Sequence, residues 1–457
     1  MLLRSSIGRT VTALTALVAL AAGCASTADP PATKPTNTPK GPVVVTFAVY
    51  GPKPVIAAYK QIAARYTVSH PTTKIVVKPY ATHDEAMAGL NSAALRDDPP
   101  DLFLMDHDDL ASLSEADAVR RVDDLLAVRE VDFGDGYTRN GLEAFSADAA
   151  LQCMPSDVSP MVVYFNPKLI ELGRIAEPGT NPVDQKDGWS LDEFARGALQ
   201  PRRRGVRGLY IAPDLEQVAP FIWSGGGEVV DDEDEPSRLT LSDGPSASAM
   251  EKLLELVRNP LLTFGQAAMR RQSELERFKA GKLGMILGFR DLTPALRAKQ
   301  NLTFDVMPLP KVGGGATIAA MTGLCISSKS EHTSETADFL TAVISDDGAA
   351  TLAATGYAMP ANLDVLNSDA FVQGGERPLN STVFAREVRD ARLLPNTPRW
   401  PIVSRAAANQ LTKLFYDPVI LPLQDRLEAI DKASISLFDP SKAPSPSASP
   451  SASPTSD

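Results

Sequence analysis

The sequence predicts an α/β protein built from two parts, each with its own sheet. Three observations support this fold class. Strand-like and helical segments alternate from residue 43 onward, and a second apolar run, residues 161–165, opens another block of the same alternation. The chain between its two tails has about four hundred residues, which is more than one hydrophobic core normally supports.

The first block begins with a strand that we expect to be central. Residues 43–50 are an unbroken β-rich run, and continuous apolar character suits a strand that is covered on both faces. The pattern then predicts a helix, a strand at 74–78, a helix at 84–95 and a strand at 101–105. This β-α-β-α-β order predicts a parallel, doubly wound sheet.

Ligands of such sheets bind beyond the carboxyl ends of the strands. The first predicted strand ends at Tyr50 and Gly51, and the third is followed by Asp106 and His107. We therefore expect these residues at the rim of a ligand site, with ordinary loop positions as the alternative.

Two passages of the chain are expected to join the two parts. Pro155 and Pro160 keep residues 151–167 extended, because each proline fixes φ and lacks an N–H donor. Three glycines at 313–315 precede a second β-type run at 319–326, which would return the chain to the first part. For the first passage, an ordinary interior strand is the alternative.

The second block contains clear helix and turn signals. Ser190 and Glu193 form a capping box, which marks the start of a helix. Helical patterns follow at 247–258 and 266–279. Between them and the capping box, glycines after Trp223 predict a sharp bend beside an exposed indole.

The first residues resemble a bacterial lipoprotein signal. Arg4 and Arg9 precede an apolar run at 11–22, which is shorter than the roughly 20 residues of a membrane span. The run ends in Leu20-Ala21-Ala22-Gly23-Cys24, where Ala21 departs from the commoner Leu. The resemblance implies cleavage before Cys24 and lipidation of its thiol with acyl chains such as palmitate. A plain secretion signal with an incidental cysteine is the alternative.

The charge and the composition of the chain indicate its partners and its unstructured ends. The net charge is −11, and loss of Arg4 and Arg9 with the signal would leave −13 (−11 minus two positive charges), which argues against nucleic-acid binding. The Pro/Thr-rich segment 25–41 reads as a solvated tether, and residues 440–457 as a disordered Pro/Ser tail.

Metal-binding and catalytic signatures are absent from the sequence. No P-loop, Gly-x-Ser-x-Gly elbow or HExxH motif occurs, so we expect no metal, no cofactor and no enzymatic activity. Export permits a disulfide between Cys153 and Cys325, and two buried free thiols are the alternative.

The ordered segments together resemble the family-one extracellular solute-binding proteins of ABC importers, to which maltose-binding protein belongs. The resemblance runs over about residues 43–437. The matching segments are the strand that ends near Tyr50, 98–102, 164–167, Trp189 with its capping box, Trp223 with Gly226 and Gly227, 278–285, 305–310 and 356–360.

This resemblance implies the type II periplasmic-binding-protein fold, with two α/β lobes, a crossover hinge and a ligand cleft between the lobes. It implies a monomer on the outer face of the cell membrane, held there through Cys24, that delivers a mono- or oligosaccharide to ABC permease subunits. The implied divisions are signal 1–23, lipidated tether 24–42, lobe one 43–154 plus 310–360, lobe two 155–309 plus 361–437, and tail 440–457.

The resemblance also implies a set of ligand-binding residues. Aromatic faces of Trp223 and Trp400 would lie on sugar C–H groups, and Asp106 and Arg290 would make charge-assisted hydrogen bonds to hydroxyls. Core packing is the alternative for each tryptophan. The full set is Tyr50, Gly51, Asp106, Trp223, Ser224, Gly225, Gly226, Phe289, Arg290, Thr322, Gly323, Arg399 and Trp400.

Two other functions stay open at this point. Arg290 and Arg399 would suit an anionic cargo, such as a glycerophosphodiester or an oligopeptide, on the same fold. An exported hydrolase would need paired carboxylates or an activated nucleophile that face the cleft. A low aromatic content of 6% leaves the identity of the sugar open.

Overall fold

The computed structural model of the protein describes residues 41–147, 149–176, 182–201, 203–418 and 422–442. All of its helices and strands lie in the unit Pro42–Asp457. The predictions for the signal, for Cys24 and for most of the tether and tail lie outside the described residues. None of the helices that the structure describes is long and apolar enough to cross a membrane.

The first sheet has the predicted parallel centre. Strand β1 (Val43–Tyr50) lies between β2 (Thr73–Tyr80) and β3 (Leu102–Asp106) and runs parallel to both. Helices α1 (Lys53–Ser69) and α2 (His83–Ala94) connect these strands. Phe47 and Val49 on one face and Ala48 on the other are all buried, as expected for an interior strand that is covered on both faces.

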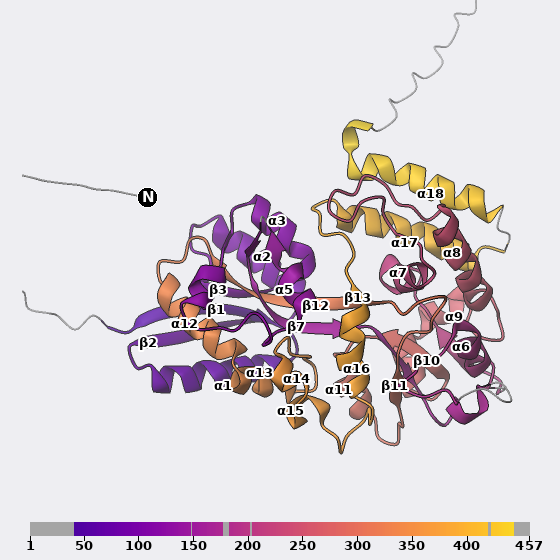
Figure 1. Ribbon diagram of the computed structural model, residues 1–457, viewed down its shortest axis with the longest axis horizontal. Helices are drawn as coiled ribbons and strands as arrows, with labels where there is room; N and C mark the ends of the chain where they lie inside the picture. The colour runs from indigo at the N-terminus through magenta and orange to yellow at the C-terminus, as the bar shows by residue number, and fades with distance from the viewer. Residues whose placement is uncertain (1–40, 148, 177–181, 202, 419–421, 443–457) are drawn as a thin grey trace, which may run out of the picture. The chain divides into compact units, whose positions relative to one another are not determined.

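Strand β12 (Thr317–Ser327) extends this sheet and sets the register of its ligand-facing end. It pairs antiparallel with β3 and with β7 (Met154–Pro160), and Figure 1 shows β7 and β12 between the two groups of helices. Thr322 is the partner of Asp106 in one ladder and of Asp157 in the other. Opposite residues of antiparallel strands share a face, so this register brings the three side chains together.

The second sheet is smaller and is buried on both faces. Its order is β11-β8-β10-β9, and β8 (Val162–Phe165) runs antiparallel to both of its neighbours. Val163 and Phe165 pack in one core, whereas Val162 and Tyr164 face another. The remaining strands of this sheet are β9 (Arg207–Tyr210), β10 (Leu283–Gly288) and β11 (Asp305–Met307).

Helices cover these two sheets. Figure 1 shows α17 and α18 beside α7 and α8, on the side of the second sheet. The longer helices not yet named are α6 (Leu191–Ala198), α7 (Leu215–Ser224), α8 (Gly244–Val257), α12 (Thr333–Ile344), α13 (Asp346–Ala353), α17 (Trp400–Tyr416) and α18 (Leu423–Phe438). Short helices include α3 (Leu110–Glu115), α11 (Leu292–Arg297), α14 (Leu363–Leu366), α15 (Asp369–Val372) and α16 (Thr382–Glu387).

Two local predictions are wrong. The single helix expected at 266–279 is two helices, α9 (Gln266–Arg271) and α10 (Glu274–Lys279), because the Ser273 side chain caps the second one. The indole of Trp223 is not exposed. It lies in the last turn of α7, it is 8% exposed, and the guanidinium carbon of Arg392 is 4.7 Å from its ring centroid.

A disulfide joins Cys153, next to the start of β7, to Cys325 on β12. Both residues are fully buried in the core of the first sheet. The bond therefore ties together the two strands that bring Asp157 and Thr322 side by side.

Candidate ligand-binding site

A cavity of about 370 Å³ lies at the carboxyl ends of β1 and β3. The first sheet contributes Tyr50, Asp106, Asp157 and Thr322 to its wall. The facing wall comes from the first turn of α7 and from the segment after β10, which supply the side chains of Glu216, Phe289 and Asp291. A groove of about 520 Å³ between α17 and α18 lies away from these strand ends.

Asp106 is held by two neighbours on the first-sheet wall. The Tyr50 hydroxyl donates a hydrogen bond to Asp106 Oδ1. His83 Nε2 lies 3.9 Å from Asp106 Oδ2 and 2.6 Å from Asp109 Oδ2. The hydrogen bond to Asp109 raises the pKa of His83 to about 9, so this imidazole is protonated at neutral pH.

Asp157 stands beside this group in the middle of the cavity wall. Its Oδ2 accepts a hydrogen bond of 2.8 Å from the Met359 backbone N–H. Burial, together with the charges of Asp291 and Asp106, raises the pKa of Asp157 to about 8. Its carboxyl group is therefore sensitive to charge placed inside the cavity.

The facing wall is also acidic. Desolvation in the cleft raises the pKa of Glu216 to about 7, and the charges of Asp214, Asp108 and Asp291 add to this effect. Burial likewise raises the pKa of Asp291. Carboxylates on the two walls are thus close enough to affect one another's protonation.

Five predicted ligand residues line this cavity. They are Tyr50, Gly51, Asp106, Phe289 and Thr322. The structure places the other predicted residues outside its lining, and each has a structural reason for its position.

Three of these residues have structural contacts. Arg290 and Trp400 are buried in the core, and Arg399 binds the end of α18. Arg290 is fully buried, and its Nη2 donates to the Phe371 carbonyl at 3.1 Å. Trp400 is 4% exposed and packs near Phe438, while Arg399 Nε donates to the Leu437 carbonyl at 2.9 Å.

Gly323 follows Thr322 at a shift in the register between β12 and β7, and it lies outside the cavity lining. A Cβ atom at this position would lie 2.6 Å from the Phe145 ring, so the glycine permits close packing of that ring.

The predicted turn after Trp223 has a structural role as well. Ser224 Oγ donates to the Gly314 carbonyl at 2.6 Å and accepts from Val312 N–H at 2.8 Å. A Cβ atom on Gly225 would lie 2.8 Å from that of Ala249, and Gly226 has a φ of 81°, which favours glycine.

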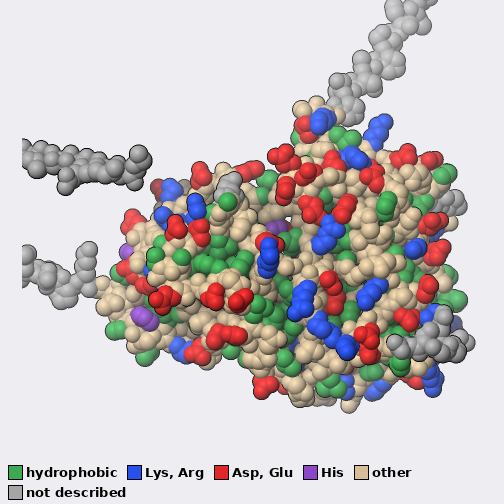
Figure 2. Space-filling view, viewed as in Figure 1, with side chains coloured by type: hydrophobic (Ala, Val, Ile, Leu, Met, Phe, Trp, Pro, Cys, Tyr) green, Lys and Arg blue, Asp and Glu red, His purple; other side chains and the backbone are tan. Residues whose placement is uncertain are grey.

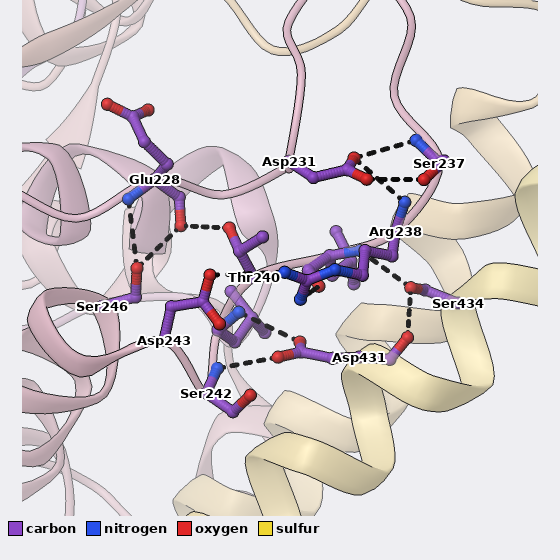
Figure 3. Close-up of polar contacts among 12 residues, drawn as sticks. Glu228, Asp231, Ser237, Arg238, Thr240, Ser242, Asp243, Ser246, Asp431 and Ser434 are labelled. Atoms are coloured by element: carbon purple, nitrogen blue, oxygen red, sulfur yellow. Dashed lines mark hydrogen bonds and ion pairs between the residues drawn. The ribbon is translucent and has the colours of Figure 1, made fainter.

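The loop beyond this turn is fixed to α18. Figure 3 shows Asp431 accepting from the Ser242 backbone and the Ser246 hydroxyl bound to the Glu228 backbone. The hydroxyl of Ser434 accepts from Leu239 N–H at 2.8 Å. These bonds account for the local conformation of the loop without any ligand.

Sequence reasoning missed several cavity residues, chiefly Asp157, Glu216, Asp291 and Tyr357. The sequence does contain a signal for Asp157, because it is the one charged residue in the strand-like segment 151–167. Glu216 and Asp291 have no such signal, because each belongs to an ordinary helix start or loop in the sequence.

Comparison with known proteins places this site in a family. A family profile described as "Bacterial extracellular solute-binding protein" matches residues 61–378. The chain belongs to this family of extracellular solute-binding proteins. No curated protein matches the sequence.

Solved structures show the same fold at low sequence identity. An ABC substrate-binding protein from Listeria monocytogenes, in complex with cycloalternan, is 15% identical with a TM-score of 0.72, over 86% of this chain and 98% of that one. The GacH receptor of Streptomyces glaucescens, solved unliganded and with acarbose, is 16% identical with a TM-score of 0.71, over 87% and 99%.

A third similar structure is the maltose-maltodextrin binding protein of Alicyclobacillus acidocaldarius. It is 20% identical with a TM-score of 0.66, over 85% of this chain and 99% of that one. The chain therefore has the type II periplasmic-binding-protein fold, and the predicted fold class is confirmed.

Proposed function

We propose that this protein captures a carbohydrate between two lobes and delivers it to the permease of an ABC importer. The observation that supports this most directly is the cavity itself. It combines ring faces with polar groups, at the carboxyl ends of parallel strands, in a chain of the solute-binding family. The similar structures with bound cycloalternan and acarbose agree with a carbohydrate cargo.

The residues of the cavity suit the two kinds of surface that a sugar presents. Tyr50, Phe289 and Tyr357 offer aromatic faces for C–H groups. Asp106 and Asp157 offer oxygens that accept hydrogen bonds from hydroxyls. A solute that touches both walls would favour the closed arrangement by its differential affinity for that state.

The wider arrangement is part of the same proposal. Lobe one would comprise residues 43–154 plus 310–360, and lobe two 155–309 plus 361–437. Lipidated Cys24 would hold a monomer at the outer face of the membrane, because acyl chains contribute about 0.8 kcal/mol of membrane binding per buried CH₂. No residue is assigned a catalytic role.

Anionic cargo is not favoured by the geometry. Arg290 and Arg399, the two residues that suggested it, bind backbone carbonyls outside the cavity. The lining of the cavity includes no lysine or arginine among the described residues. Glycerophosphodiesters and oligopeptides therefore serve as comparison ligands in the test.

Thermal unfolding of the protein with a panel of mono- and oligosaccharides tests the proposal. A sugar at 100 times its Kd should stabilise the fold by about 2.7 kcal/mol. Phe289→Ala should weaken binding about tenfold through loss of a ring face. Leu261→Ala, a change at a residue that is 69% exposed, is the matched control. Stabilisation by a peptide or a phosphodiester and by no sugar would refute the carbohydrate assignment.

A further inference from the structure

The cavity has a one-sided charge composition. Among the described residues, five carboxylates and no lysine or arginine line it; the carboxylates are Asp106, Asp108, Asp157, Glu216 and Asp291. Elsewhere acidic and basic side chains are interspersed, as Figure 2 shows for one face of the molecule. The lining of the cavity therefore differs from the surface around it.

These carboxylates have only partial neutralisation from within the protein, from protonated His83 at Asp106 and from the charge of Arg290, which acts on Asp157. Among the described residues, no lysine or arginine forms an ion pair with any of the five. Asp106 lies 3.9 Å from His83, and Asp108 lies 3.7 Å from His107. Asp157, Glu216 and Asp291 have no ion-pair partner in the described chain.

The acidic groups come from both walls and act on one another. The charge of Asp108, from the first-sheet side, reaches Glu216 on α7, and the charge of Asp291 reaches Asp157. A cleft lined by one sign of charge focuses its field between walls of low dielectric constant. The empty cleft therefore carries unfavourable repulsion that a positive group between the walls would relieve.

A second feature of the same cavity is independent of the carboxylates. The rings of Tyr50, Tyr59, Phe289 and Tyr357 are in its lining. Aromatic faces attract cations through the quadrupole of the ring, and an aromatic and acidic lining is the usual environment for a bound ammonium group. A neutral sugar would use the rings and would donate hydroxyl hydrogen bonds to Asp106 and Asp157, but it would bring no positive charge to the five carboxylates.

We propose that the solute is a carbohydrate that carries a protonated amine, with the amine between the carboxylates of the two walls. This proposal rests on the proposed function and narrows its substrate class. The amine would donate charge-assisted hydrogen bonds to Asp157 and to Glu216 or Asp291. One cation would thereby hold the two walls together.

Calorimetric titration of the whole protein with matched probes tests this inference. Glucosamine, N-acetylglucosamine and glucose differ only in the group on carbon 2, and their β-1,4-linked disaccharides extend the series. The amines should bind at least about tenfold more tightly than the hydroxyl and acetamide forms. This advantage should shrink as salt rises from about 0.01 M to 1 M, because salt screens charges in an open cleft.

Two substitutions locate the effect. Glu216→Gln and Asp291→Asn should each reduce the preference for the amine while binding of the hydroxyl form persists. Glu216 has an exposed side chain, so its replacement leaves the core intact. Glu331→Gln, at another exposed carboxylate outside the cavity, is the matched control and should keep the full preference.

The outcomes separate this inference from the proposed function. Equal affinity for amine and hydroxyl forms would overturn the inference and leave carbohydrate binding standing. Tight binding of spermidine and of no sugar would support the cationic site and overturn the carbohydrate assignment. If neither the sugars nor spermidine bind, both are overturned.

Discussion

Three consecutive residues after β10 divide between two environments. Phe289 and Asp291 line the cavity, whereas Arg290 between them turns to the opposite side and is fully buried. There its Nη1 donates to Ser381 Oγ at 3.2 Å, and its guanidinium carbon lies 4.6 Å from the centre of the Phe371 ring. Neighbours in sequence thus have unrelated roles, one in the core and two at the ligand.

The same division holds for the charges around them. Behind the second sheet, cations bind backbone oxygens: Arg297 donates to the Arg377 carbonyl, and Arg377 donates to that of Phe304 at 3.2 Å. These bonds fix the segment that contains α15 and α16. Among the described residues of the cavity lining, the acidic side chains have no lysine or arginine beside them, and the nearest cation is protonated His83 next to Asp106. The comparison teaches that the arginines beside the second sheet are used for folding, where Arg297 also pairs with Glu376, whereas the described lining of the cavity has acids without lysine or arginine.

The largest expected effect concerns the disulfide behind the cavity wall. Replacing both Cys153 and Cys325 with Ser should destabilise the protein by roughly 4 kcal/mol, because the bond closes a long loop of chain. Urea unfolding of both proteins measures the loss. In the folded variant, the relative affinities for glucosamine, N-acetylglucosamine and glucose should stay unchanged. A changed order of affinity would show that the cavity depends on the core behind it.

Arg290→Ala should have the next largest effect. It removes a buried side chain that packs on Phe371 and leaves the Ser381 hydroxyl without its donor, so we expect a loss of about 3 kcal/mol. Lys299→Ala, at an exposed position on the same side, should change stability by less than about 0.5 kcal/mol. If the Arg290→Ala protein were stable but bound sugar more weakly, Arg290 would belong to the ligand site and not to the core.

Asp157→Asn should increase the stability of the fold, unlike the two changes above. Its pKa in the fold, about 8, exceeds the ordinary value of 3.8, so the stability linked to this carboxyl is present below pH 3.8 and lost as pH rises through 8. Asparagine does not ionise, so the variant does not lose stability as the pH rises. The variant should therefore gain on the wild type across this range, by about 1 kcal/mol near pH 8 after screening by cleft water. Melting curves from pH 5 to 9 measure the gain, and a constant difference would contradict it.

The smallest effect is expected at His83. Its raised pKa, about 9 against an ordinary 6.5, means that its contribution is complete below pH 6.5 and disappears as pH passes 9. His83→Gln should therefore lose some stability at pH 6 and little at pH 9.5, with a difference under about 1 kcal/mol because the side chain is partly exposed. A larger loss at pH 9.5 than at pH 6 would show that Asp109 is not its main partner.

Several features of the fold could be predicted because they depend on near neighbours in sequence. Residues 43–50 read as a central strand from their unbroken β-rich composition, and Ser190 with Glu193 read as a capping box that the structure contains. Strand ends then led to Tyr50 and Asp106 as residues of the cavity. The predicted exposure of the Trp223 indole was wrong, because Arg392, which is far away in the sequence, covers the ring.

The sequence by itself determined the order of strands and helices, the doubly wound first sheet and the family resemblance. Only the tertiary structure decided that Asp157, Glu216 and Asp291 share the cavity with Asp106. Asp106, Asp157 and Thr322 meet because β12 pairs with both β3 and β7, and the register of those ladders links residues more than fifty positions apart. Local propensity acts over a few residues, whereas the side to which Arg290 or Asp291 turns depends on packing with distant segments.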